Sequence, residues 1–195
     1  MKFIDDRIRL VNVDVNYLSE LHQVSEEVRC AQGYQNKPFI GMLIQNDNMK
    51  YIIPLSSAKP KHKGWKDESN YCFLIYEIVD KSVIPNNSIY VSTNDSSYPN
   101  QVKHILSVLD LKKMIPVPEE VYSFIDVNAK DSDTKELQKY KDLLDKELKF
   151  CLTIKNKILE KAKKLYIKQT DKGNIRFCVD FTAVEKVCKK YCTMP

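Results

Sequence analysis

The stretch that decides the fold reads YQNKPFIGMLIQNDNMKYIIPLSSAKPKH, residues 34–62. Two apolar runs within it, 39–45 and 49–55, are rich in Ile, Leu and Tyr, as β-strands are. The polar residues 46–48 between them, Asn-Asp-Asn, are typical of a turn. The pattern therefore predicts an antiparallel hairpin.

The register of this hairpin predicts a cluster of polar side chains at its open end. If Gln45 lies opposite Met49, then Lys37 falls opposite Ser57, because the pairing runs evenly along antiparallel strands. Two amines, two hydroxyls and an imidazole at one sheet edge suit a phosphate better than a carbonyl. The residues expected there are Lys37, Ser56, Ser57, Lys59 and His62.

Composition predicts one ordinary folded domain over residues 1–195. Apolar residues make up 43% and charged residues 29% of the chain, and the net charge of +5 permits phosphate or nucleic-acid binding without requiring it. Strand patterns fill residues 1–125, and helical patterns fill residues 130–195. The order predicts an α+β fold in which the helical part packs on the strands.

Several functional classes lack their sequence signals. With four glycines and neither a G-x-x-x-x-G-K nor a G-x-G-x-x-G motif, folds that bind nucleotides through glycine-rich turns are disfavoured. The six cysteines form no C-x-x-C pair and the three histidines lack metal-ligand spacing, so we expect no metal and no other cofactor. No secretion signal and no membrane-spanning apolar run is evident, which predicts a cytoplasmic protein that does not bind membranes.

Three helices are expected. Asp14 is a plausible N-cap for a helix that runs to about Val28. Apolar residues recur at three- and four-residue steps from about Thr134 to Ile167, which predicts one long helix with an almost wholly basic exposed face after Lys149. Asp180 or Thr182 then caps a short final helix.

The polar cluster could cleave RNA. The 2′-OH of RNA lies beside the scissile phosphate, so an enzyme needs only to remove its proton, stabilise the phosphorane and protonate the leaving 5′ oxygen. The competing interpretation is a solvated turn with a lysine-rich loop. Tyr17 and Tyr34 fit either a core edge or a platform for base stacking, and Trp65 fits either a cover for the core or a stacking partner.

Five segments together resemble one known family, the ToxN/AbiQ endoribonuclease toxins of bacterial type III toxin–antitoxin systems. The most specific are KPFIG at 37–41 and YIIPLSSAKPKH at 51–62, and LDLKKMIPV at 109–117 supports them. MKF at 1–3 and NYL at 16–18 are also similar. The resemblance is good to about residue 125 and looser over the helical part.

The resemblance implies a strongly curved antiparallel sheet of the MazF/Kid type with helices packed around it. It implies metal-independent cleavage of cellular or phage RNA, which leaves 2′,3′-cyclic phosphate and 5′-OH ends. It also implies an antitoxin made of RNA, a repeated pseudoknot, that joins several toxin copies into an RNA-bridged hetero-oligomer. Systems of this kind stop phage by abortive infection.

Position by position, Ser57 resembles the central catalytic hydroxyl and Ser56 the adjacent one, while Lys37 and Lys59 resemble the two active-site lysines. His62 is demoted by this comparison from a proton carrier to an RNA-binding residue. The residues expected to contact RNA are Tyr17, Tyr34, Lys61, His62, Lys63, Trp65, Lys155, Lys161 and Lys164. Two alternatives stay open: a non-catalytic RNA-binding protein, and a MazF-like toxin with a protein antitoxin.

Overall fold

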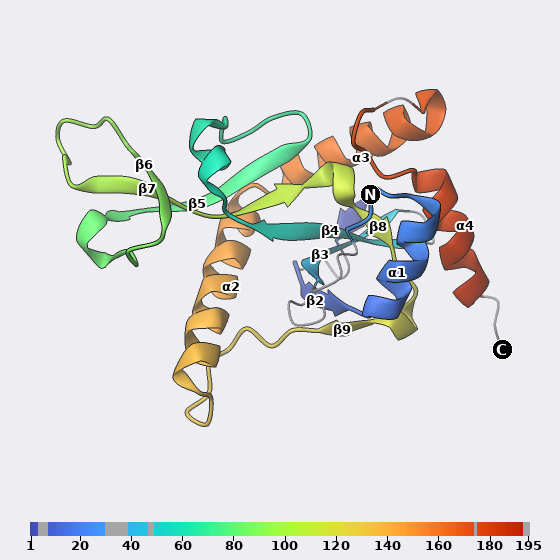
Figure 1. The fold of residues 1–195 in the computed structure, drawn as a ribbon, viewed down its shortest axis with the longest axis horizontal. Helices are drawn as coiled ribbons and strands as arrows, with labels where there is room; N and C mark the ends of the chain where they lie inside the picture. Colours follow the sequence, from blue (N-terminus) through green and yellow to red (C-terminus); the bar gives the residue numbers. More distant parts are fainter. Residues whose placement is uncertain (4–7, 30–38, 47–48, 174, 193–195) are drawn as a thin grey trace. The chain divides into compact units, whose positions relative to one another are not determined.

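The computed structural model describes residues 1–3, 8–29, 39–46, 49–173 and 175–192 (Figure 1). These residues form two compact units, each with both strands and helices. The first unit contains residues 1–55, 110–125 and 155–195, and the second contains 56–109 and 126–154. The expected division into a strand-rich and a helical part therefore cuts across both units, and the single domain over the whole chain stays a prediction.

The first unit contains antiparallel strands, as the sequence predicts. Strand β2 pairs with β3 on one side and β9 on the other, β3 also pairs with β1 and β4, and β8 pairs with β4. The bounds are β1 (Lys2–Phe3), β2 (Leu10–Val13), β3 (Phe39–Asn46), β4 (Met49–Ser57), β8 (Ile115–Pro116) and β9 (Tyr122–Phe124).

The hairpin of β3 and β4 exists, but its expected register is wrong by one residue. Asn46 pairs with Met49 and Gln45 with Lys50, so two residues separate the strands rather than three. Two-residue connections are favoured because their twist matches that of the strands. The placement of Lys37 opposite Ser57 loses its basis, and Lys37 itself lies outside the described residues.

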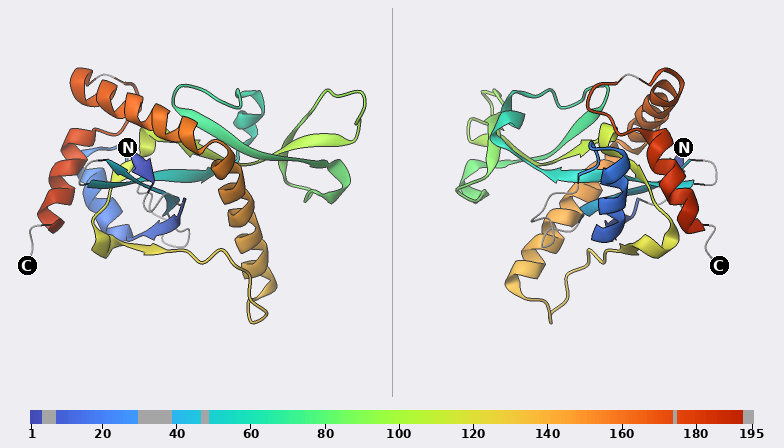
Figure 2. Two further views of the ribbon diagram at one scale, coloured as in Figure 1. Left: turned by 180° about the vertical axis from the view of Figure 1, so that it is seen from behind. Right: turned by 45° about the vertical axis from the view of Figure 1, so that its right-hand side comes forward.

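The helices of the first unit are α1 (Val15–Val24), α3 (Lys155–Lys172) and α4 (Phe181–Cys192). Asp14 caps α1 as predicted, because its carboxylate accepts hydrogen bonds from the N–H groups of Asn16 and Tyr17 at 2.8 and 3.1 Å. The carboxylate of Asp180 accepts a hydrogen bond from the N–H of Ala183, so of the two caps predicted for α4 it is Asp180 that caps the helix. Helices α1 and α4 lie side by side (Figures 1 and 2).

The core of the first unit contains an aromatic cluster centred on Tyr51 of β4. Tyr51 is completely buried, and its ring makes edge-on contacts with Tyr166 of α3 and Phe181 of α4. Both tyrosine hydroxyls donate hydrogen bonds to Glu185 of α4. The strand and the two C-terminal helices are thereby joined through one set of side chains.

The second unit packs one helix against strands. Leu74, Ile105 and Val108 form a buried cluster, and α2 packs on β5. Strand β6 pairs with β7, with Tyr90 opposite His104. The bounds are η3 (Pro60–Gly64), β5 (Cys72–Asp80), η4 (Lys81–Val83), β6 (Ile89–Ser92), β7 (Gln101–Asp110) and α2 (Lys135–Thr153).

The single long helix expected over 134–167 is wrong. Helix α2 ends at Thr153 and α3 begins at Lys155, because Ile154 leaves helical geometry with φ −116° and ψ 15°. The apolar period continues almost unbroken through this point, so the spacing alone could not reveal the break. None of the helices that the structure describes has the length and apolar character needed to cross a membrane.

Glu147 is a buried carboxyl in the second unit. Its side chain, on α2, is 4% exposed. Burial raises its pKa to about 7, and the hydroxyl of Ser107 opposes this only in part. The folded state therefore binds this proton more tightly than the unfolded chain does. The contribution of Glu147 to stability is therefore fully present below about pH 4.5 and is lost as the pH rises to about 7.

Replacing Gly41 with alanine should destabilise the first unit. A Cβ on Gly41 would lie closer than 3.0 Å to the Ile52 side chain and the Ile53 carbonyl, so β3 and β4 must separate. We expect the free energy of unfolding, measured by urea denaturation, to fall by about 2 kcal/mol. Gly64→Ala is the matched control, since its Cβ would meet nothing within 4 Å. An equal effect of both substitutions would contradict this account of Gly41.

Replacing Glu147 with glutamine should make stability less dependent on pH. At pH 8 the variant should exceed the wild type by about 3 kcal/mol, the free energy that corresponds to a pKa raised from 4.5 to about 7. Below pH 4.5 the difference should disappear, because the wild-type carboxyl is then protonated in both states. Urea denaturation at a series of pH values measures this, with the exposed Glu120→Gln as control.

Candidate functional site

The two serines predicted to be catalytic end β4. Ser56 is half-buried and Ser57 is exposed, and the N–H of Ala58 donates to the Leu106 carbonyl of β7 at 3.3 Å. Lys59, two residues beyond Ser57, is also exposed. The hydrogen bond of Ala58 fixes the backbone between them, so hydroxyl and amine groups project from a supported strand end rather than from a loose loop.

The loop after Lys59 folds around a histidine. His62 is 4% exposed, and its Nδ1 accepts a hydrogen bond from the N–H of Lys59 at 3.0 Å. The N–H of His62 donates in turn to the Lys59 carbonyl at 2.8 Å, and the Trp65 ring lies 4.6 Å from the imidazole, centre to centre. The imidazole therefore holds the backbone of Lys59 in place.

Two residues expected to contact RNA are core residues in this structure. His62 is buried as described above. Tyr17 is 1% exposed, and its hydroxyl donates to the Pro116 carbonyl at 2.8 Å. Of the two roles that the sequence left open for Tyr17, the geometry favours the core.

The remaining predicted residues divide by location. Lys37 and Tyr34 lie outside the described residues. Lys155 and Lys164 are exposed on α3 of the first unit, and Lys164 pairs with Glu160 at 2.5 Å. Ser56, Ser57, Lys59 and the cationic loop belong to the second unit. Three of the four predicted catalytic residues therefore lie in one described stretch of four residues at the end of β4, and their catalytic role stays a prediction.

The loop forms part of a surface that the sequence did not reveal. Lys61 lies 5.6 Å from the centre of the Trp65 ring, within the range of a cation–π contact. Lys63 and Lys81 each lie 5.5 Å from the centre of the Tyr90 ring. We call Lys61, Lys63, Trp65, Lys81 and Tyr90 the lysine–aromatic surface. Lys81 and Tyr90 were missed because only the packing of β6 against η3 brings them beside the loop.

Metal ligands do not cluster in the part of the chain that the structure describes: no group of three or more His, Cys, Asp or Glu side chains there could hold an ion. What the described side chains offer instead is hydroxyls and amines at a strand end, beside exposed cations and aromatic rings. These groups can bind phosphate and stack on bases.

Sequence comparisons identify relatives over most of the chain. The family model described as "Toxin ToxN, type III toxin-antitoxin system" matches residues 9–189. The endoribonuclease ToxN of Pectobacterium atrosepticum is 27% identical over 158 residues, which are 80% of this chain and 77% of that protein. The endoribonuclease ToxN of Bacillus thuringiensis subsp. kurstaki is 24% identical over 195 residues, with 95% and 85% covered.

Solved structures share the fold. A bacterial type III toxin selectively inhibited by a non-coding RNA pseudoknot aligns with TM-score 0.67 and 21% identity, covering 97% of this chain and all of that one. AbiQ, a lactococcal anti-phage endoribonuclease of a type III system, aligns with TM-score 0.62 and 21% identity, covering 96% and 99%. The α+β class with a curled antiparallel sheet is confirmed.

Proposed function

Because the chain belongs to the family of ToxN toxins of type III toxin–antitoxin systems, we propose that it is an endoribonuclease that cuts RNA without a metal ion. The 2′-OH adjacent to the scissile bond loses its proton and attacks phosphorus. The bond from phosphorus to the 5′ oxygen breaks, and that oxygen takes up a proton. The products are a 2′,3′-cyclic phosphate and a 5′-OH.

The observation that carries this proposal is the exposed end of β4. Ser57 and Lys59 are both accessible there, on backbone fixed by Ala58 and by the imidazole of His62. The hydroxyl of the exposed Ser57 hydrogen-bonds a reacting oxygen, and the ammonium of Lys59 stabilises the charge of the phosphorane. Ser56 precedes Ser57 in β4 and its side chain alternates to the other face, so its hydroxyl is assigned to the site only as the family resemblance implies. Lys37 supplies the second amine in this proposal, as the family resemblance implies.

The partner is a folded RNA that inhibits the toxin. Two curated relatives are named endoribonucleases, and one structural neighbour is inhibited by an RNA pseudoknot. The lysine–aromatic surface of this chain offers charge for phosphates and rings for unpaired bases. The α3 lysines Lys155, Lys161 and Lys164 form a further basic contact region in this proposal. We also propose, as the family resemblance implies, RNA-bridged assemblies with several toxin copies that act against phage.

Replacing Ser57 with alanine should slow cleavage strongly while leaving the fold intact. Purified protein is incubated with RNA in EDTA, and the ends are mapped by their cyclic phosphates. The wild type should produce 2′,3′-cyclic phosphate and 5′-OH ends. Ser57→Ala should lower the rate by about 100- to 1,000-fold, the loss typical for one positioned hydrogen-bonding group in a transition state.

The exposed Ser96 provides a matched control, and Ser96→Ala should cut at the wild-type rate. A Ser57→Ala protein as active as the wild type would count against the assigned site. A wild type that binds RNA but cuts none would favour the alternative, a non-catalytic RNA-binding protein.

Removing a lysine beside Tyr90 should weaken RNA binding and its salt dependence. In a Ser57→Ala background that leaves RNA uncut, Lys63→Ala or Lys81→Ala should lower the slope of log K against log salt by about 0.7 to 0.9. Filter binding at a series of salt concentrations measures the slope. Lys149→Ala is the control, since this exposed lysine on α2 belongs neither to the lysine–aromatic surface nor to the α3 lysines. Equal slopes in all variants would exclude the surface from RNA binding.

A further inference from the structure

A cavity of about 650 Å³ begins at the proposed catalytic serine. Ser57 and Ala58 line it, and its other walls come from the ends of β5 and β6, from β7, from the segment 83–88 and from α2. All of these residues belong to the second unit. A volume of this size is typical of sites that hold a small molecule or a single group of a larger one.

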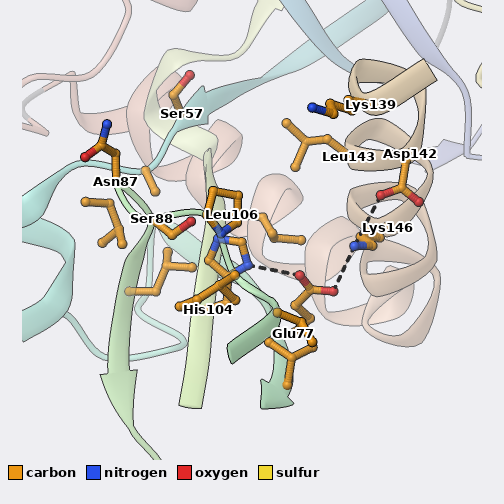
Figure 3. A pocket seen from close by; sticks show the side chains of 17 residues that line it. Ser57, Glu77, Asn87, Ser88, His104, Leu106, Lys139, Asp142, Leu143 and Lys146 are labelled. Atoms are coloured by element: carbon orange, nitrogen blue, oxygen red, sulfur yellow. Dashed lines mark hydrogen bonds and ion pairs between the residues drawn. The ribbon is translucent and has the colours of Figure 1, made fainter. Parts of the chain in front are cut away.

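The walls of the cavity are mostly apolar. Leu106 of β7 and Leu143 of α2 line it, together with Val83 and Ile84 of the segment before β6. Val83 is 70% exposed. When a ligand covers an apolar side chain that was open to water, the free energy of the complex falls, which favours binding. Figure 3 shows Asn87 and Ser88 on one side of the cavity and Lys139 and Leu143 on the other, with Ser57 above Ser88 in this view.

Most of the charged side chains that line the cavity are held in one network of pairs. Glu77 accepts a hydrogen bond from Nδ1 of His104 at 2.9 Å and pairs with Lys146 at 3.3 Å (Figure 3). Lys146 also pairs with Asp142 at 3.2 Å. Burial alone would lower the pKa of Lys146, but the two carboxylates outweigh it and raise that pKa. Within this network the ammonium of Lys146 is compensated by two carboxylates, which leaves it little attraction for a phosphate, whereas an uncharged ring can lie against it. Lys139 of α2, a further cation of the lining, lies outside this network.

The network also orients His104. Because a carboxylate oxygen can only accept a hydrogen bond, Nδ1 carries the proton in the bond to Glu77. Nε2 is then the remaining polar atom of the ring, and in the neutral imidazole it can accept a hydrogen bond from a ligand. Asn87 adds a carbonyl acceptor and an amide donor, and Ser88 adds a hydroxyl.

We propose that this cavity binds the base of an RNA nucleotide next to the cut bond, and so selects the sequence that is cleaved. The inference rests on the proposed function and assigns it a specificity site. A nucleobase has apolar faces for the walls and a polar edge for Asn87, Ser88 and His104, and unpaired bases are the usual targets of sequence-specific RNA recognition. With the base in the cavity, its backbone lies at the rim beside Ser57.

The test compares cut-site preferences. Wild type, Asn87→Ala and Leu143→Trp are incubated with a pool of RNA oligonucleotides of random sequence, and the cut ends are sequenced. Asn87→Ala should lower the preference for the favoured base at one position beside the cut by about 10-fold, the size expected for one good base contact. Leu143→Trp fills the cavity and should reduce the preference at the same position.

Asn86→Ala is the matched control, because Asn86 is exposed, adjacent in the chain and not a cavity residue. It should keep the wild-type preference. A wild type that cuts RNA with a site preference unchanged by Asn87→Ala and Leu143→Trp would overturn the base site alone. A wild type that cuts no RNA would overturn the proposed function itself.

Discussion

The hydrogen bond from the buried phenol of Tyr51 to Glu185 is the interaction on which the first unit depends. Burial, together with the nearby carboxylate, raises the pKa of Tyr51, so the hydroxyl remains a donor. Glu185 also accepts from Tyr166 at 2.7 Å, and the rings of Tyr166 and Phe181 stack at 5.6 Å. A single β4 residue thereby joins both C-terminal helices to the strand whose far end carries Ser57.

The second unit supports the proposed chemistry by a different means. Its polar groups are held in pairs, with the imidazole of His62 on the Lys59 backbone and the carboxylate of Glu77 on His104. In each pair the histidine ring is held in one orientation by its hydrogen bond and serves to position its partner, rather than to carry a proton. Groups held in this way lose little conformational freedom when a ligand binds, which favours both affinity and rate.

Local features were predictable from the sequence and long-range ones were not. The two apolar runs around 46–48 and the cap at Asp14 depend on residues close in the chain, and both are confirmed. The hairpin register differs from the prediction by one residue, and the helix break is the non-helical backbone of the single residue Ile154. The spacing of apolar residues does not resolve differences of one residue. The burial of His62 could not be predicted from the loop sequence, because the residues around it in the chain are polar.

The order in which the chain contributes to its two units has a consequence for synthesis. Five successive segments alternate between the units, so neither is encoded by one continuous stretch. Because the partners of Tyr51 include Phe181 and Glu185, this aromatic cluster cannot close until those residues have been synthesised. A growing chain therefore carries Ser57 long before the packing around its strand is complete, so the strand that presents this hydroxyl is among the last parts of the first unit to be fixed.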